Sequence, residues 1–180
     1  MNRIRNERTV YVPARELAAD CTVIVSSILE VNQKFLMVER TTSSRIQLNP
    51  PQGRLRPGQG IGHCAVSRSE SEAGFTFVPT HLIGIYESCD DEGAVMCIRV
   101  AVTGKSIARM KTDPGNKESG VVTNRWMTLE QIAGERESLE SEIAHRCLMD
   151  YRIGHRYPLN IFRMSIAEPP KKTAVNLAES

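Results

Sequence analysis

The feature that most constrains this chain is the stretch from Asn49 to Phe75, which reads NPPQGRLRPGQGIGHCAVSRSESEAGF. Its early part, residues 53–60, contains three glycines and a proline, so we expect a loop there. A helix is predicted over Gly62–Glu72, because Gly74 follows as the kind of residue that ends a helix with positive φ. A glycine-containing loop that leads into a helix is typical of sites that handle phosphate.

Apolar runs with many β-branched residues flank this stretch on both sides and predict strands. The expected strands cover residues 21–32, 34–40, 46–48, 75–88 (one bent strand or a pair), 93–105 and 125–127. The first two are predicted to form a β-hairpin across Asn32 and Gln33. Thr128, with Gln131 three residues later, predicts a capped helix, and apolar residues at helical spacing predict another over Ser138–Tyr151. Strands and helices in this order indicate an α/β fold, with a mixed β-sheet sandwiched between helices.

Composition divides the chain into one domain and two polar ends. Its 180 residues, of which 41% are hydrophobic, suffice for a single domain with a core. We expect an N-terminal extension at residues 1–20, a domain at residues 21–160 and a flexible C-terminal tail at residues 161–180. Within the extension, Thr9–Val12 is a candidate strand that Pro13 stops.

Charge and cysteine content narrow the classes of function. A net charge of +2 disfavours nucleic acid as a partner. No stretch approaches the ~20 apolar residues that span a bilayer, and the N-terminus lacks a signal-like apolar region, so a cytoplasmic location without a membrane partner is expected. The five cysteines never form a CxxC pair, which argues against a structural zinc site or a disulfide framework. Cys21 and Cys97 lie in apolar runs and are expected in the core.

The predicted helix offers only one acid suited to a metal ion. Residues four apart share a helix face, so Arg68 and Glu72 are expected to be neighbours, whereas Glu70 points about 160° away from Glu72. Magnesium in such sites takes carboxylate oxygens, and Arg68 places a fixed positive charge where the cation would lie. Two interpretations stay open: a solvated salt bridge worth ~0.2–0.5 kcal/mol, or a guanidinium that replaces the metal and binds phosphate directly.

The same stretch resembles the Nudix box, the signature G-x5-E-x7-R-E-U-x-E-E-x-G-U in which U is a bulky apolar residue. Gly53, Glu72, Gly74 and Phe75 match it in register without a gap, and Gln59 stands at the first glutamate. The order of strands and helices over about residues 20–160 is also similar to that of the Nudix superfamily, and GHRYPL resembles its NudJ-type phosphatases. The resemblance implies a Nudix fold whose box glutamates hold Mg²⁺ for the hydrolysis of diphosphate compounds.

Five positions depart from that signature. Where the family has Glu, Arg, Glu, a bulky apolar residue and Glu, this chain has Gln59, Ser67, Arg68, Ser69 and Ser71. Loss of the ligands together with the arginine that orients them predicts that ordinary metal-dependent hydrolysis is lost or strongly reduced. A register shift by one residue would align Arg68 with the family arginine. It requires an insertion and a deletion within the helix, so it stays the minor alternative.

The candidate site residues are mostly basic. The resemblance places the substrate cleft near the strand end that carries Arg40 and near the box loop, and arginines gathered there favour an anionic ligand. Substrate binding is assigned to Arg40, Arg45, Arg54, Arg56 and Arg68. Glu72 is the remnant catalytic and metal-binding residue, with replacement acids to be sought at Glu87, Asp90, Asp91, Glu92, Glu140 and Glu142. His63 and Cys64 are expected to be structural.

Three functions follow from these observations. The first is a pseudoenzyme that binds a nucleotide or another diphosphate compound without a cofactor, as a binding or regulatory module. The second is a divergent pyrophosphohydrolase that uses Mg²⁺, and the third is a different reaction in the same cleft. The expected partner is a phosphorylated small molecule or nucleotide, while a homodimer and a protein partner are left open.

Overall fold

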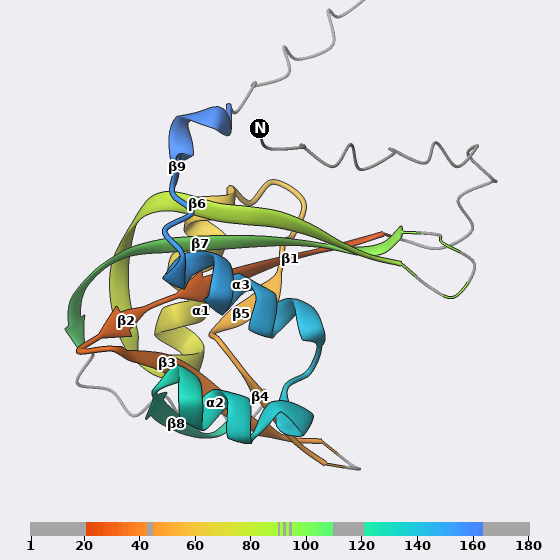
Figure 1. The fold of residues 1–180 in the computed structure, drawn as a ribbon. Helices are drawn as coiled ribbons and strands as arrows, with labels where there is room; N and C mark the ends of the chain where they lie inside the picture. Colours follow the sequence, from red (N-terminus) through yellow and green to blue (C-terminus); the bar gives the residue numbers. More distant parts are fainter. Residues whose placement is uncertain are drawn as a thin grey trace, which may run out of the picture.

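The computed structural model describes residues 21–42, 45–89, 91, 93, 95–109 and 121–163, which form two β-sheets between helices (Figure 1). One sheet has the order β5-β1-β7-β6-β9, with β5 at Gln52–Arg54, β1 at Thr22–Ile28, β7 at Val95–Arg109, β6 at Phe75–Cys89 and β9 at Tyr157–Pro158. The other sheet joins β2 (Glu30–Val31), β3 (Lys34–Thr41), β4 (Ile46–Asn49) and β8 (Val121–Met127). The first sheet is mixed, because β1 pairs with β7 in parallel and the other pairs are antiparallel.

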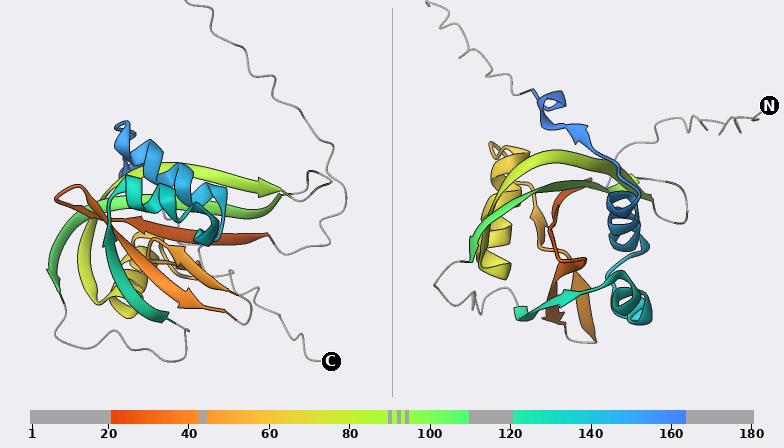
Figure 2. Two further views of the ribbon diagram at one scale, coloured as in Figure 1. Left: turned by 60° about the horizontal axis from the view of Figure 1, so that its bottom comes forward. Right: turned by 60° about the vertical axis from the view of Figure 1, so that its left-hand side comes forward.

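Helices lie on both sides of these strands. On one side, α1 (Ile61–Arg68) continues directly into the π-helix η1 (Ser69–Ala73). On the other side lie α2 (Leu129–Gly134), the 3₁₀ turn η3 (Arg136–Ser138) and α3 (Glu142–Arg152), as the right-hand view of Figure 2 shows; a short 3₁₀ turn, η4 (Leu159–Ile161), follows β9. The predicted α/β fold, with strands between helices, is confirmed.

Successive side chains of β3 pack alternately into two core clusters, one under each layer of helices. Leu36 and Val38 belong to the cluster beneath α1, whereas Phe35 and Met37 belong to the cluster beneath α2 and α3. Successive side chains of a strand point to opposite faces, so a strand buried on both faces contributes to both clusters. The box helix and α3 are thereby held on opposite sides of the same strands.

The predicted hairpin of residues 21–32 with 34–40 is only partly right. Asn32 and Gln33 form the turn, with φ of 50° and 63°, but only β2 pairs with β3 across it. The preceding strand, β1, lies in the other sheet between β5 and β7. Val25, Ser26, Ser27 and Ile28 are all buried, so β1 is covered on both faces and suits the interior of a sheet.

Other element predictions are confirmed or corrected in detail. Residues 75–88 form one bent strand with several register shifts, and Thr128 with Gln131 makes the capping box. Gly53 and Arg54 belong to β5 and not to a loop, because they pair with β1. The last long helix begins at Glu142 and not near Ser138, since η3 and a bridge from Leu139 to Leu48 come first.

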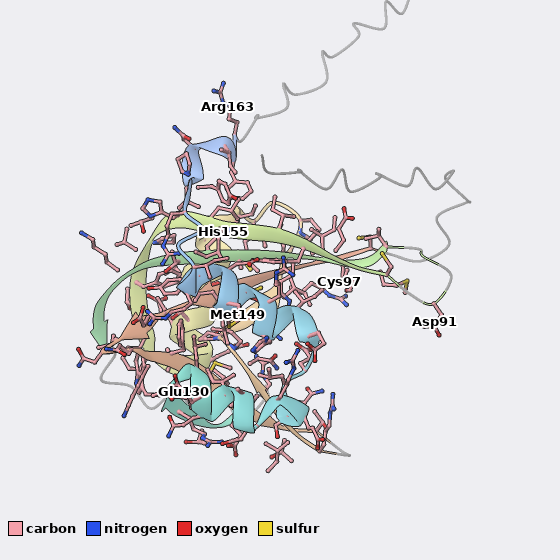
Figure 3. The ribbon with its side chains drawn as sticks, in the orientation of Figure 1. Asp91, Cys97, Glu130, Met149, His155 and Arg163 are labelled. Carbon is pink, nitrogen blue, oxygen red and sulfur yellow. The ribbon has the colours of Figure 1, made fainter. Side chains whose placement is uncertain are left out.

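The expected burial of two cysteines is wrong. Cys97 is only half-buried, because it lies near the end of the β6–β7 hairpin (Figure 3). Cys21 is exposed, because it precedes Thr22, the first residue of β1 and the partner of Cys97. Cys64 and Cys147 are buried instead. The candidate strand Thr9–Val12 and most of the C-terminal tail lie outside the described residues. Within the described ranges, no helix is long and apolar enough to cross a membrane.

Candidate functional site

A cleft of about 310 Å³ opens where β1, β3 and β5 meet the α1–η1 helix. Its lining consists of Ile24, Arg40, Gln52, Gly53, Arg54, Arg68, Glu72 and Glu140. Three of the five predicted arginines, Arg40, Arg54 and Arg68, are therefore brought together with the remnant glutamate. Three arginines and two glutamates give the lining a net charge of +1, which favours an anionic ligand.

Glu72 is buried in this cleft and held by two donors. Its side chain is 4% exposed; one oxygen accepts a hydrogen bond from the Gln52 backbone N–H at 3.0 Å, and the other accepts from the Arg40 guanidinium. Burial raises the pKa of the Glu72 carboxyl above its ordinary value, while the charge of Arg40 and the Gln52 N–H oppose that rise. Each oxygen keeps a second lone pair, so what opposes a metal ion at Glu72 is the positive charge of Arg40 and not the hydrogen bonds themselves.

The predicted pair of Arg68 with Glu72 is wrong, because Glu72 pairs with Arg40 of β3. The helix changes from α to π at Ser69, and the wider turn changes the spacing that places residues i and i+4 side by side. Arg68 instead lies along Gly53, where an added Cβ would overlap the Arg68 side chain. Gly53 therefore provides room for the arginine, and Gly74 ends the helix with φ of 66°, as predicted.

A second polar network supports the floor of the cleft. Arg99 of β7 is 4% exposed; its guanidinium donates to Ser26 Oγ at 3.1 Å, to Glu140 Oε2 at 3.2 Å and to the Gln52 side-chain oxygen. Gln52 Nε2 also donates to Glu140 Oε2 at 2.5 Å. Because Gln52 binds Glu72 through its backbone and Glu140 through its side chain, it joins both carboxylates of the cleft.

Sequence reasoning did not identify Arg99 or Gln52. The signal for Arg99 was present, since a lone charge inside an apolar strand must find a partner when it is buried. The bond from Gln52 to Glu72 is made by its backbone N–H, which side-chain identity does not indicate, and its side-chain bonds depend on Arg99 and Glu140, far away in the chain. Glu140 was only one of several candidate acids, and its position in the cleft follows from the turn before α3.

The remaining predicted residues lie elsewhere. Arg45 and Arg56 are exposed and do not line the cleft, and Glu142 pairs with Arg136. Glu87 lines a different groove, Asp91 is exposed at the β6–β7 connection, and Asp90 and Glu92 lie outside the described residues.

Residues of the box frame have packing and loop contacts. Gln59 accepts a hydrogen bond from the Arg56 backbone N–H at 3.3 Å, and Phe75 packs edge-on against Trp126. His63 is exposed, whereas burial raises the pKa of the Cys64 thiol, whose sulfur lies 3.8 Å from the Gly53 and Arg54 carbonyl oxygens.

Metal binding in this cleft would depend on two carboxylates. Among the described residues, Glu72 and Glu140 alone contribute acids to its lining, and each contacts an arginine. Over the described part of the chain, no three His, Cys, Asp or Glu side chains are grouped as metal ligands. Mg²⁺ bound by one or two carboxylates relies on substrate phosphates for further oxygens. The chemistry of the lining therefore fits phosphate oxygens better than a free divalent cation.

A family match defines the class of protein. The family model of the NUDIX domain matches residues 21–148, more than half of the chain, and the chain therefore belongs to the Nudix family. Phosphatase NudJ of Escherichia coli strain K12 is 26% identical to this chain over 140 residues, which cover 77% of this chain and 88% of that protein.

Solved structures agree with that assignment. A NUDIX hydrolase from Nitrosomonas europaea superposes with a TM-score of 0.72 and is 30% identical, covering 81% of this chain and 98% of the other. An ADP compounds hydrolase superposes with a TM-score of 0.61 at 11% identity, covering 76% of this chain and 74% of the other, and shows that the fold is shared.

Proposed function

We propose that this Nudix-family protein binds a nucleotide or another diphosphate compound in the cleft, and that Mg²⁺-dependent hydrolysis there is weak or lost. The observation that carries the proposal is the pairing of Glu72 with Arg40. Glu72 is the residue that matches the last glutamate of the Nudix signature. Arg40 and the Gln52 N–H each donate a hydrogen bond to one of its oxygens, and Arg40 places a positive charge directly beside the carboxylate. A metal ion at Glu72 would have to displace or face the Arg40 guanidinium, which repels it.

The arginines supply what a diphosphate ligand needs. Arg40, Arg54 and Arg68 line one cleft, and a guanidinium binds phosphate oxygens through two parallel N–H groups. Arg68 stands at a position where the family signature has an acid, so a positive side chain lies where metal-bound phosphate would be expected. In this proposal the guanidinium groups neutralise the ligand directly.

A second candidate is a divergent hydrolase that uses Mg²⁺. Relatives described as Phosphatase NudJ, NUDIX hydrolase and ADP compounds hydrolase favour it. The shared cleft position of Glu72 and Glu140 also favours it, since two carboxylates and substrate phosphates can complete a magnesium site. Glu72 would then hold the ion, which would neutralise the phosphates, after Arg40 had moved to the ligand.

Binding and turnover measurements separate the two candidates. Calorimetric titration with ADP in EDTA should show binding that Arg68→Ala weakens about tenfold, the scale of one lost charge-assisted contact. Arg45→Ala is the matched control, because Arg45 is exposed outside the cleft. Chromatography of the products formed with Mg²⁺ or Mn²⁺ should show turnover near background for nucleoside di- and triphosphates, thiamine diphosphate and ADP-ribose. Robust turnover that Glu72→Gln abolishes and Glu142→Gln preserves would establish the hydrolase instead.

A further inference from the structure

A groove outside the cleft runs along the edge of β6. It has a volume of about 590 Å³, and its lining comprises Leu82, Ile83, Gly84, Ile85, Tyr86 and Glu87, with Ile143, Arg146, Asp150, His155, Tyr157 and Ile161. Successive side chains of a strand point to opposite faces, so six consecutive residues can line one groove only along the edge of the strand. The groove therefore exposes the backbone of β6.

The edge of β6 is paired over a short length only. On its outer side, β9 pairs with His81 and Leu82, and no described strand pairs with β6 beyond them on that side (Figure 1). Alternate residues from Gly84 to Ser88 thus direct backbone N–H and C=O groups outward. An open edge of this kind is a template for another strand, and proteins commonly cover it.

We propose that residues Thr9–Val12 of the N-terminal extension add to this open edge of β6 as a further strand. The segment reads TVYV, which combines β-branched and aromatic residues, and Pro13 limits its length. The groove offers apolar surface to such side chains, since Ile85, Tyr157 and Ile161 are 54%, 47% and 51% exposed. The GHRYPL segment then has a role as a wall of the groove, through His155 and Tyr157.

The start of β1, which follows the N-terminal extension, is close enough to this edge for the extension to reach it. Thr22 at the start of β1 is level with Cys97 of β7, which is in turn level with Ser88 of β6. A strand added outside β6 would lie three strand spacings from β1, about 14 Å away. Residues 13–20 can span up to about 26 Å when extended, enough for Thr9–Val12 to run along β6 in either direction.

Charge favours the same placement. Residues 1–16 contain four arginines and two glutamates. Glu87 lies in the groove and Asp91 is exposed at the end of the β6–β7 hairpin (Figure 3), and neither has an ion-pair partner among the described residues. Arg146, the basic residue of the groove, is already paired with Asp150. Arginines that flank Thr9–Val12 would therefore meet acids at this edge.

Hydrogen–deuterium exchange of the full chain tests the proposal. Peptides that cover Gly84–Ser88 should exchange about tenfold faster in the double variant Val10→Pro/Val12→Pro than in the wild type, because proline removes the donors of the added strand. The matched control is Ala18→Pro/Ala19→Pro, which leaves Thr9–Val12 unchanged and should exchange like the wild type. Thermal unfolding confirms that all three chains are folded.

Three results would overturn the proposal. Equal exchange of Gly84–Ser88 in all three chains would show that the edge stays open. An equal gain in exchange for the control variant would show that Thr9–Val12 is not the pairing segment. Protection that grows with protein concentration, together with a doubled mass in size-exclusion chromatography with light scattering, would assign the edge to a second copy of the chain.

Discussion

At the residue scale, the missing side chain of Gly53 leaves the space that the Arg68 side chain fills. An added Cβ would overlap the side chain of Arg68, so Gly53→Ala must displace the arginine from the cleft. Because the overlapping atoms belong to a flexible, partly exposed side chain that can turn aside, we expect a change below about 1 kcal/mol in the free energy of unfolding and ADP binding that is about tenfold weaker, as for Arg68→Ala. Gly62→Ala is the control, since a Cβ there meets nothing within 4 Å and the helix gains about 0.5–1 kcal/mol. Urea denaturation and calorimetric titration with ADP measure both variants, and unchanged ADP affinity in Gly53→Ala would contradict this packing.

The titration of Glu72 predicts a pH dependence of stability. Burial raises its folded-state pKa above the ordinary value of 4.5, so the folded state binds the proton more tightly than the unfolded chain. As pH rises from 4.5 through the raised pKa, stability contributed by this group falls. Over that pH range, the unfolding free energy of the wild type should therefore fall relative to that of Glu72→Gln, whose side chain does not titrate. A difference that does not change with pH would show that Arg40 fully offsets burial.

At the scale of elements, β7 carries a buried charge that organises the cleft. Replacing Arg99 by Met removes the charged donor of Gln52 and Glu140 and leaves them with neutral donors only, Ser26 Oγ and Gln52 Nε2, so we expect a loss of about 1–3 kcal/mol in unfolding free energy and weaker ADP binding. Arg125→Met is the control, because Arg125 pairs with Glu39 and Glu135 at the surface and should cost less than about 1 kcal/mol. Equal ADP affinity in wild type and Arg99→Met would limit Arg99 to a role in folding.

How far the elements could be predicted depends on how local their causes are. The Thr128 cap, the Gly74 helix end and the Asn32–Gln33 turn depend on neighbours in the chain, and all three form as expected. The placement of β1 between β5 and β7 depends on partners far along the chain. The change to a π-helix at Ser69 has no signature in residue type, and it moved the partner of Glu72 from Arg68 to Arg40.

At the scale of the whole molecule, the cleft joins both sheets and the box helix, so its occupant should stabilise the fold. Ligand at 100 times its dissociation constant adds about 2.7 kcal/mol to the unfolding free energy. ADP in EDTA should therefore raise the melting temperature of the wild type, whereas Mg²⁺ alone should leave it unchanged. Arg40→Met should melt lower, because breaking a buried pair costs about 3 kcal/mol, and should regain stability when Mg²⁺ binds the freed Glu72 carboxylate. A wild-type melting temperature that Mg²⁺ raises without nucleotide, with no such rise in Glu72→Gln, would show that the ion binds at Glu72 and that Arg40 does not exclude it.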